Sequence, residues 1–271
     1  MIKLVAFDMD GTFLNTQNDY DRKRFDKIFQ DLTARDIKIV AISGNQFHQI
    51  KTFFEPYLDQ MTIVSEIGNK IYENGHLLQE HHFDQSVVKG ILDLLGQKNL
   101  LSRCMVGGLD HAYFGAAAPE DFKKIVKKHN YSWKELESFA ELPEDKFCIV
   151  TLDVPDQDIA DLVDQINEMS GPRARAVSSG FQFIDIIQPT INKGTALQFL
   201  GQRWGISLDE MMTFGDSDND LEMLDLTPHS YAMANCPENV GQRAKNQAPS
   251  NDESGVLVVI EREILGKADE G

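Results

Sequence analysis

An apolar run from Ile2 to Phe7 ends abruptly at two aspartates, and no other feature constrains the fold as strongly. The run is short and rich in β-branched and aromatic residues, which favours a buried strand. Asp8 and Asp10 follow at once, and Gly11 allows a sharp turn. Ligands bind at the carboxyl ends of the strands in an open parallel sheet, so both carboxylates would stand at a crevice. Taken alone, the pattern also fits an ordinary strand and turn.

Strand and helix patterns alternate on either side of a central block. Helical spacing over 20–35 separates the first strand from an apolar run over 37–42, which makes a βαβ unit. The same style returns late in the chain, with strand patterns at 211–214 and 230–234 and helical patterns at 194–204, 221–224 and 237–245. We therefore expect an α/β fold with a doubly wound, Rossmann-like parallel sheet.

The central block has its own inventory of elements. Helical patterns cover 86–95, 119–129 and 158–169, and strand patterns cover 103–114 and 146–154. Residues 174–187 supply two short strands about Ser179-Gly180, which suits a hairpin turn. A chain of 271 residues is long enough for two domains. We expect residues 1–83 and 188–271 to form one core domain, and residues 84–187 to form an α/β domain inserted into it.

Charge and cysteine content narrow the partners. The net charge is −17, from 26 basic and 43 acidic side chains, which argues against nucleic acid or an anionic membrane as a partner. Cys104, Cys148 and Cys236 lie far apart, so neither a disulfide framework nor a zinc site is indicated. The first apolar run stops too early for a signal peptide. We expect a cytoplasmic protein, either a monomer or a weak homo-oligomer.

Polar clusters follow three predicted strands, at Asp8 and Asp10, at Ser43 and Gly44, and at 216–220. Two carboxylates about 5 Å apart repel by roughly 3 kcal/mol at an effective dielectric constant of 20, so a crevice that gathers several needs a cation or shifted pKa values. The clusters hold no histidine or cysteine, which favours Mg²⁺ over zinc. Magnesium commonly serves phosphate groups, so the pattern indicates phosphoryl chemistry.

Four short motifs in order carry a resemblance to a known family. They are Asp8-Met9-Asp10-Gly11-Thr12, Ser43-Gly44-Asn45, Lys193-Gly194 and Gly215-Asp216-Ser217-Asp218-Asn219-Asp220. Each stands at a predicted strand end or helix start, and together they resemble the motifs of the haloacid dehalogenase (HAD) superfamily of phosphatases. The inserted block resembles the large α/β cap of its Cof-type sugar-phosphate phosphatases. The resemblance covers essentially the whole chain.

The resemblance implies roles for the first two motifs. Asp8 would be the nucleophile that forms an aspartyl-phosphate, and it would also bind Mg²⁺. Asp10 would protonate the leaving alcohol and then take a proton from water, while its backbone carbonyl binds the metal. Ser43 and the backbone N–H of Gly44 would hold phosphate oxygens. A serine at this place is also a common helix N-cap.

The resemblance also implies roles for the last two motifs. Lys193 would neutralise charge that grows on the phosphoryl group, although a lysine at a helix start is by itself usually solvated. Asp216 would be the side-chain ligand of Mg²⁺, with Asp220 supporting it from behind, and Asn219 would donate to phosphate. Asp218 also fits a simple acidic cluster at a helix N-terminus.

These roles imply a Mg²⁺-dependent phosphatase that acts on small phosphorylated metabolites, above all sugar phosphates. Two alternatives stay open: a phosphotransferase or mutase that uses the same intermediate, and a non-catalytic sensor of a phosphorylated ligand. The sensor is disfavoured because it has little need of a proton-transfer group at Asp10. One departure concerns the substrate: relatives often have Glu-Asn-Gly where this chain has Glu66-Ile67-Gly68, so an asparagine that could meet the substrate is absent.

Overall fold

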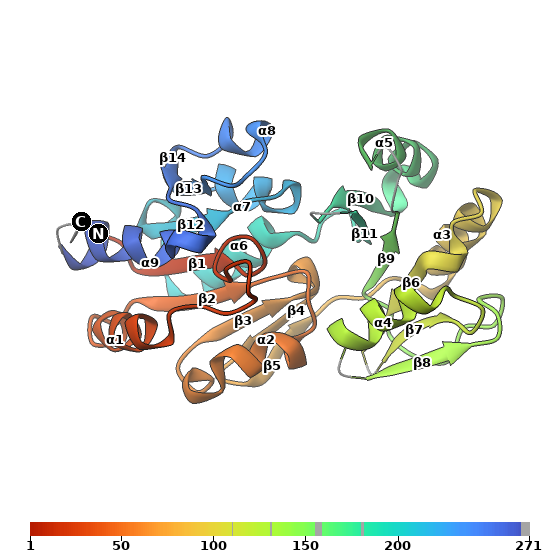
Figure 1. Cartoon of the computed structure of the whole chain (residues 1–271), viewed down its shortest axis with the longest axis horizontal. Coiled ribbons are helices and arrows are strands. Elements are labelled where there is room, and N and C mark those ends of the chain that lie inside the picture. Colours follow the sequence, from red (N-terminus) through yellow and green to blue (C-terminus); the bar gives the residue numbers. More distant parts are fainter. Residues whose placement is uncertain (110, 131, 155–158, 180–181, 267–271) are drawn as a thin grey trace.

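Two β-sheets organise the chain, one in each of two lobes (Figure 1). The computed structural model describes residues 1–109, 111–130, 132–154, 159–179 and 182–266. The first lobe holds an eight-stranded sheet together with the N-terminus and the last described residues before 267, and the second lobe holds a six-stranded sheet. Asp158 and Gly180, which the sequence places in a helix and a turn, lie outside the described residues.

The eight-stranded sheet runs in the order β14-β13-β12-β1-β2-β3-β4-β5. Neighbouring strands from β14 to β3 are parallel, and the β4–β5 hairpin adds two antiparallel strands at one edge. The strands are β1 (Leu4–Asp8), β2 (Lys38–Ile42), β3 (Thr62–Ser65), β4 (Lys70–Glu73), β5 (His76–Glu80), β12 (Met211–Gly215), β13 (His229–Met233) and β14 (Asn246–Ala248).

Both faces of this sheet are covered by helices, so its central strands are apolar on both sides. Val5 and Phe7 face a core that includes helices α1, α2 and α9, whereas Leu4 and Ala6 face the opposite core with α6 and α7. These helices, with the short α8, are α1 (Arg22–Thr33), α2 (Phe47–Phe54), α6 (Lys193–Trp204), α7 (Leu221–Asp225), α8 (Glu238–Gly241) and α9 (Gly255–Ile260). The predicted doubly wound α/β fold is confirmed.

The strand order reverses between β1 and β12. The chain moves from β1 to β2 and β3 in one direction, and from β12 to β13 and β14 in the other. The carboxyl ends of β1 and β12 therefore flank the point where helices leave to opposite faces, which is where open α/β sheets bind ligands. Asp8 ends β1, and Asp216 directly follows β12.

The six-stranded sheet runs in the order β10-β11-β9-β6-β7-β8. All its neighbours are antiparallel except β7 and β8. Its elements are β6 (Cys104–Gly107), β7 (Ala112–Gly115), β8 (Trp133–Leu136), β9 (Ile149–Asp153), β10 (Arg175–Ser178) and β11 (Phe183–Ile187), with helices α3 (Gln85–Gln97), α4 (Glu120–His129) and α5 (Ile159–Ser170). All of them lie inside the stretch predicted as the insertion; the domain limits at 83/84 and 187/188 stay a prediction.

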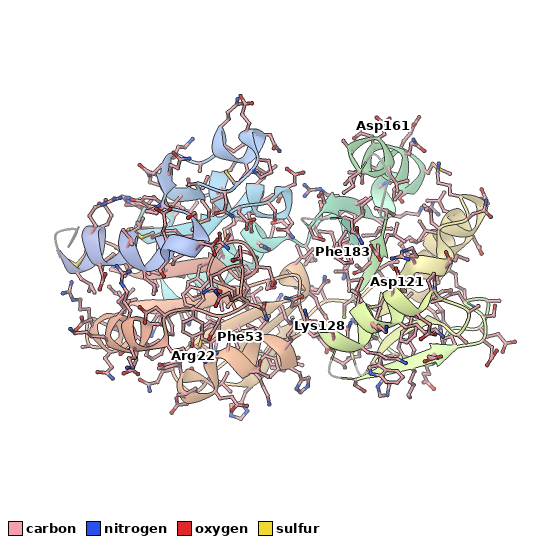
Figure 2. The ribbon with its side chains drawn as sticks, viewed as in Figure 1. Arg22, Phe53, Asp121, Lys128, Asp161 and Phe183 are labelled. Atoms are coloured by element: carbon pink, nitrogen blue, oxygen red, sulfur yellow. The ribbon has the colours of Figure 1, made fainter. Side chains whose placement is uncertain are left out.

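Period-two alternation gives the two faces of this sheet different partners. Val150, Leu152 and Ile184 pack into a core with α3 and α5. Their neighbours Ile149 and Ile187 lie on the other face and pack against Ile67 of the first lobe. The β9–β11–β10 end of the sheet thus turns one face to its own helices and the other to the first lobe. Phe183, on that second face, lies at the edge of its lobe that borders the first (Figure 2).

Three stretches differ from the sequence prediction. Residues 103–114 are not one strand but the antiparallel pair β6 and β7. The helix expected over 237–245 stops at Gly241, and the three-residue strand β14 follows it. Strand β8 was not predicted, because its four residues are mostly exposed and carry charge. None of the helices in the described ranges has the length and apolarity needed to span a membrane.

Candidate active site

The end of β1 presents its two aspartates differently. Asp8 is 5% exposed, whereas Asp10 is exposed to solvent. Between them, Met9 is buried in the core and its carbonyl accepts hydrogen bonds from the N–H groups of the turn that follows, at Phe13 and Leu14. Gly11 has a φ of +81°, a conformation that glycine adopts without strain. One short loop therefore supplies a buried carboxylate and an accessible one.

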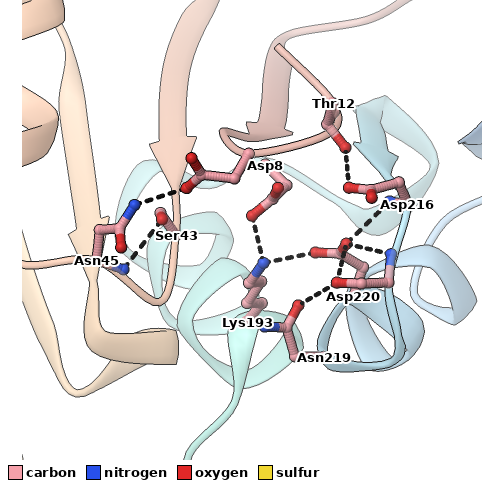
Figure 3. Close-up of polar contacts among 10 residues, drawn as sticks. Asp8, Thr12, Ser43, Asn45, Lys193, Asp216, Asn219 and Asp220 are labelled. Carbon is pink, nitrogen blue, oxygen red and sulfur yellow. Dashed lines mark hydrogen bonds and ion pairs between the residues drawn. The ribbon is translucent and has the colours of Figure 1, made fainter. Parts of the chain in front are cut away.

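Lys193 lies buried between two carboxylates (Figure 3). It is the first residue of α6, which begins with a capping box formed by Asn192 and Thr195. Its Nζ lies 2.5 Å from Asp8 Oδ1 and 2.7 Å from Asp220 Oδ1. The solvated lysine that its sequence position alone would favour is therefore wrong, because the cap holds the start of the helix against the strand ends.

The loop after β12 fixes Asp216 and Asp220. Thr12 donates a hydrogen bond of 2.7 Å to Asp216 Oδ1. The other oxygen, Oδ2, lies 2.4 Å from the position that a Cβ at Gly11 would occupy, so only glycine allows this approach. Asp220 Oδ2 accepts the backbone N–H groups of Asp216 and Ser217, each at 3.0 Å. With Oδ1 on Lys193, both oxygens of Asp220 are engaged.

Burial and the closeness of the three carboxylates shift the pKa values of this cluster. Burial raises the pKa of Asp8 well above its usual range, with Lys193 opposing the shift and the two neighbouring carboxylates adding to it. Burial and the charge of Asp220 raise the pKa of Asp216 to about 7. Burial opposes the charge of Lys193, but Asp220 and Asp8 together raise its pKa above the ordinary value.

The donor set fits Mg²⁺. Carboxylate oxygens of Asp8, Asp216 and Asp220 lie within 4.8 Å of one another, with neither histidine nor cysteine among them. Three carboxylates meet one ammonium group, so two negative charges remain, which a divalent cation balances. Because both oxygens of Asp220 are already engaged, Asp8 and Asp216 are the available side-chain ligands.

Ser43 and Asn45 follow the end of β2, which neighbours β1 in the sheet. Ser43 is buried and its Oγ accepts the backbone N–H of Asn45 at 3.0 Å. The alternative that Ser43 caps the next helix is wrong, because α2 has Gln46 as its N-cap residue. Asn45 donates through Nδ2 to Asp10 Oδ2 at 2.6 Å. Asn45 and Thr12 both belong to the quoted motifs, but no role was predicted for either of them.

Asn219 and Asp218 have separate partners. Ser217 Oγ donates to Asn219 Oδ1 at 3.0 Å, which orients the amide and leaves its Nδ2 to donate elsewhere. Asp218 Oδ1 instead accepts from Asn239 of α8 at 2.6 Å. Asp218 is therefore bound away from the Lys193 cluster, as the alternative interpretation of the sequence allowed.

A pocket of about 260 Å³ opens between the lobes. Its walls include Phe47, His48 and Tyr72 from the first lobe and Leu109 and Ser132 from the second. The rings of Phe47 and Tyr72 stack at a centroid distance of 3.7 Å. Gln46, which directly follows Asn45 in the chain, also lines this pocket, so the pocket offers room for a small leaving group near the strand ends.

The turn after β3 ties the lobes together beside this pocket. Glu66 and Ile67 have φ values of +51° and +58°, in the left-handed region that a β-branched residue rarely adopts. Ile67 is buried against the second lobe. Lys70 Nζ contacts Glu66 at 3.0 Å and the carbonyl oxygen of Gly108 in the second lobe at 3.1 Å.

The sequence is similar to those of known hydrolases. Residues 5–260 match a family described as haloacid dehalogenase-like hydrolase. The chain is 32% identical over 271 residues to the 5-amino-6-(5-phospho-D-ribitylamino)uracil phosphatase YbjI of Escherichia coli (strain K12), covering 98% of each chain. It is 25% identical to the HMP-PP phosphatase of Citrobacter koseri, over 87% of this chain and 85% of that protein.

Solved structures have the same architecture. The crystal structure of SMU.1108c from Streptococcus mutans UA159 superposes with a TM-score of 0.93 at 36% identity, over 98% of this chain and all of that one. A haloacid dehalogenase-like hydrolase from Bacillus subtilis superposes with a TM-score of 0.82 at 22% identity, over 97% of this chain and all of that one.

Proposed function

Because the chain belongs to the haloacid dehalogenase-like hydrolases and is a phosphatase of that family, we propose that it hydrolyses monophosphate esters of small hydroxylated metabolites through Asp8. The observation that carries the proposal is the buried contact of Lys193 with Asp8 and Asp220 beside the exposed Asp10. It brings together a nucleophile, a fixed positive charge and a proton-transfer group.

Asp8 is the nucleophile in this proposal. Lys193 holds its Oδ1, which leaves Oδ2 to attack phosphorus. A bond forms between Asp8 and phosphorus as the bond from phosphorus to the leaving oxygen breaks, and water then displaces the phosphoryl group from the aspartyl-phosphate. Burial supports this role, since a poorly hydrated carboxylate near a lysine attacks without first losing a water shell.

Asp10 transfers the protons. It gives a proton to the leaving oxygen in the first step and takes one from the attacking water in the second. Its exposure allows contact with the leaving group, and the hydrogen bond from Asn45 to Oδ2 fixes the orientation of the side chain. Asn45 is in this proposal a positioning residue.

The remaining groups bind and orient the phosphoryl oxygens. The Lys193 ammonium group stabilises negative charge on them without any rearrangement, because Asp220 and Asp8 already fix it. Ser43, the Gly44 N–H and the Asn219 amide are the proposed donors to the phosphate. Asp220 contributes indirectly, by holding Lys193.

Asp8, Asp216 and the Asp10 carbonyl would hold Mg²⁺. When bound, the ion supplies charge neutralisation and a fixed position for a phosphate oxygen. Thr12 and the backbone N–H groups that engage Asp220 keep this part of the loop in place.

Hydroxyl-rich esters such as sugar phosphates are the proposed substrates. The pocket between the lobes combines polar walls with two stacked rings, which suits a small leaving group that carries hydroxyls. The name of the Escherichia coli relative likewise describes a phosphate on a ribityl chain.

Phosphate release from a panel of phosphate esters tests this proposal. The panel comprises sugar phosphates, polyol phosphates, a nucleotide, a flavin phosphate and pyridoxal phosphate, each with Mg²⁺ and with EDTA. We expect release by the unaltered chain that stops in EDTA and falls by at least 10³-fold in Asp8→Asn. Asp218→Asn is the matched control: it removes an acid from the same acidic loop but not from the cluster, so it should keep most of the activity.

Two outcomes would replace the proposal. Loss of the ester without free phosphate, with the phosphoryl group found on a second sugar, would make the chain a phosphotransferase or mutase. A rise in melting temperature with sugar phosphates, but no turnover of any ester, would make it a sensor.

A further inference from the structure

One carboxylate of the second lobe, that of Asp185, lies close to the proposed phosphate site. Asp185 of β11 pairs in register with Thr151 of β9 and Val177 of β10, so the three side chains share one face of the sheet. That face carries Ile149 and Ile187, which pack on Ile67 of the first lobe. Asp185 therefore belongs to the wall that covers the strand ends.

The Asp185 side chain is 95% buried, and hydroxyl groups hold it in place. Thr151 Oγ1 donates to Asp185 Oδ1 at 2.7 Å. The Ser179 hydroxyl also favours the charged form, but burial has the larger effect and raises the pKa of Asp185. A carboxylate has about four acceptor positions, so two hydroxyls leave capacity for a further donor.

Asp153 gives a contrast within the same sheet. It is also buried, but Arg103 pairs with it at 2.6 Å and Gln182 donates to it. The charge of Asp153 is therefore compensated within the second lobe, by a partner whose removal would leave a buried carboxylate unpaired. For Asp185, the charge that opposes the rise in pKa is that of Lys193 in the first lobe, and its effect is smaller than those of burial and of the two hydroxyls.

Asp185 lies close to Gly44 of the first lobe. A Cβ placed on Gly44 would lie 3.5 Å from Asp185 Oδ2 and 3.7 Å from Ile67 Cγ1. The backbone of Gly44 is a proposed phosphate donor, so a phosphoryl group bound there would lie near Asp185. A carboxylate there repels phosphate but accepts hydrogen bonds from hydroxyls on the carbon atoms next to it.

We propose that Asp185 determines substrate specificity by accepting a hydrogen bond from a hydroxyl of the leaving group near the phosphoester, which selects polyol and sugar phosphates over phosphates of plain alcohols. This inference rests on the proposed phosphatase function and adds a residue of the second lobe to it. Thr151 is the positioning residue, because it fixes the carboxylate through Oδ1.

The test compares two five-carbon esters, ribitol 5-phosphate and n-pentyl phosphate, which share a primary phosphoester but differ in hydroxyls. The measured quantity is the ratio of their kcat/KM values, in the unaltered chain and in Asp185→Asn, Asp185→Ala, Thr151→Val and Asp153→Asn. The ratio separates hydroxyl recognition from general damage, because a merely structural change lowers both values together.

We expect the unaltered chain to prefer ribitol 5-phosphate and Asp185→Ala to reduce that preference by roughly 10- to 100-fold, as for loss of a hydrogen bond to a charged group. Asp185→Asn and Thr151→Val should reduce it by a smaller factor, and they carry the test if the alanine variant does not fold. Asp153→Asn should leave the ratio unchanged.

An unchanged ratio in the Asp185 variants would overturn the inference while leaving the phosphatase proposal intact. A fall in KM for both esters alike would also overturn it, since Asp185 would then act only by repelling phosphate. If the unaltered chain hydrolyses neither ester nor any other member of the panel, the proposed function fails, and this inference fails with it.

Discussion

Ile67 has a strained backbone conformation, and its cost can be measured by comparing alanine and glycine variants at Ile67 and at an unstrained position. Its φ of 58° and ψ of 27° are left-handed, which costs a residue with a Cβ about 1–2 kcal/mol. Val177 contacts the same cluster from strand β10, where the backbone is extended. Alanine and glycine substitutions at both positions separate strain from packing, because glycine is free of the left-handed penalty and alanine is not.

The magnitudes follow from what each substitution removes. At Val177, glycine buries one carbon atom fewer than alanine, which costs about 0.8 kcal/mol. Glycine also loses more backbone entropy on folding, which costs about 0.7 kcal/mol. Val177→Gly should therefore be about 1.5 kcal/mol less stable than Val177→Ala. At Ile67, relief of strain offsets these losses, so Ile67→Gly should lie within about 0.5 kcal/mol of Ile67→Ala. Both Ile67 variants should be about 3 kcal/mol less stable than the unaltered chain.

Urea-induced unfolding gives the four free energies, compared on the same transition. The alanine-to-glycine difference at Val177 should exceed that at Ile67 by about 1–2 kcal/mol. Equal differences at the two positions would refute the reasoning, because they would mean that the turn after β3 relaxes without cost.

Three further predictions concern the site and its surroundings. Lys193→Met should lower stability by about 3–5 kcal/mol, because it leaves two buried carboxylates unpaired, and should abolish turnover; calorimetry that finds no loss of stability would contradict the buried contact. Gly11→Ala should raise the Mg²⁺ concentration needed for half-maximal activity by displacing Asp216, whereas Gly75→Ala, with a similar φ of +77° and open space around it, should not. Burial raises the pKa of Tyr20 to about 12, above its usual value near 10, so the stability from its neutral form is complete below pH 10 and lost as the pH rises towards 12; Tyr20→Phe should flatten the loss seen in alkaline unfolding.

Much of the fold could be predicted because the apolar runs are short, buried and separated by helical periodicity. The ends of β1 and β12 were located correctly for that reason, and Asp8 and Asp216 with them. The stretches that were missed lack this signal. Strand β14 has three residues, of which two are exposed, and β8 is held mainly by its pairing with β7.

The parts of the candidate site that could be predicted are those where a residue in a recognised motif has a role implied by the resemblance. Asp8 and Lys193 come together as expected, but Asn45 and Thr12 act through contacts that the spacing of residues does not reveal. Thr12 meets a partner 204 positions away. Ile67 could not be predicted as left-handed, because a β-branched residue avoids that conformation unless the surrounding structure imposes it.

The alternation in β11 limits how this protein can diversify. Ile184 and Ile186 point into their own lobe, while Asp185 and Ile187 point towards the first. Replacing a residue on the second face changes what the leaving group meets without disturbing the core behind it. Deleting or inserting one residue in β11 would exchange the two faces, burying Asp185 among aliphatic side chains. Related chains should therefore acquire new substrates by point replacement within this strand, and tolerate length changes only in the loops at its ends.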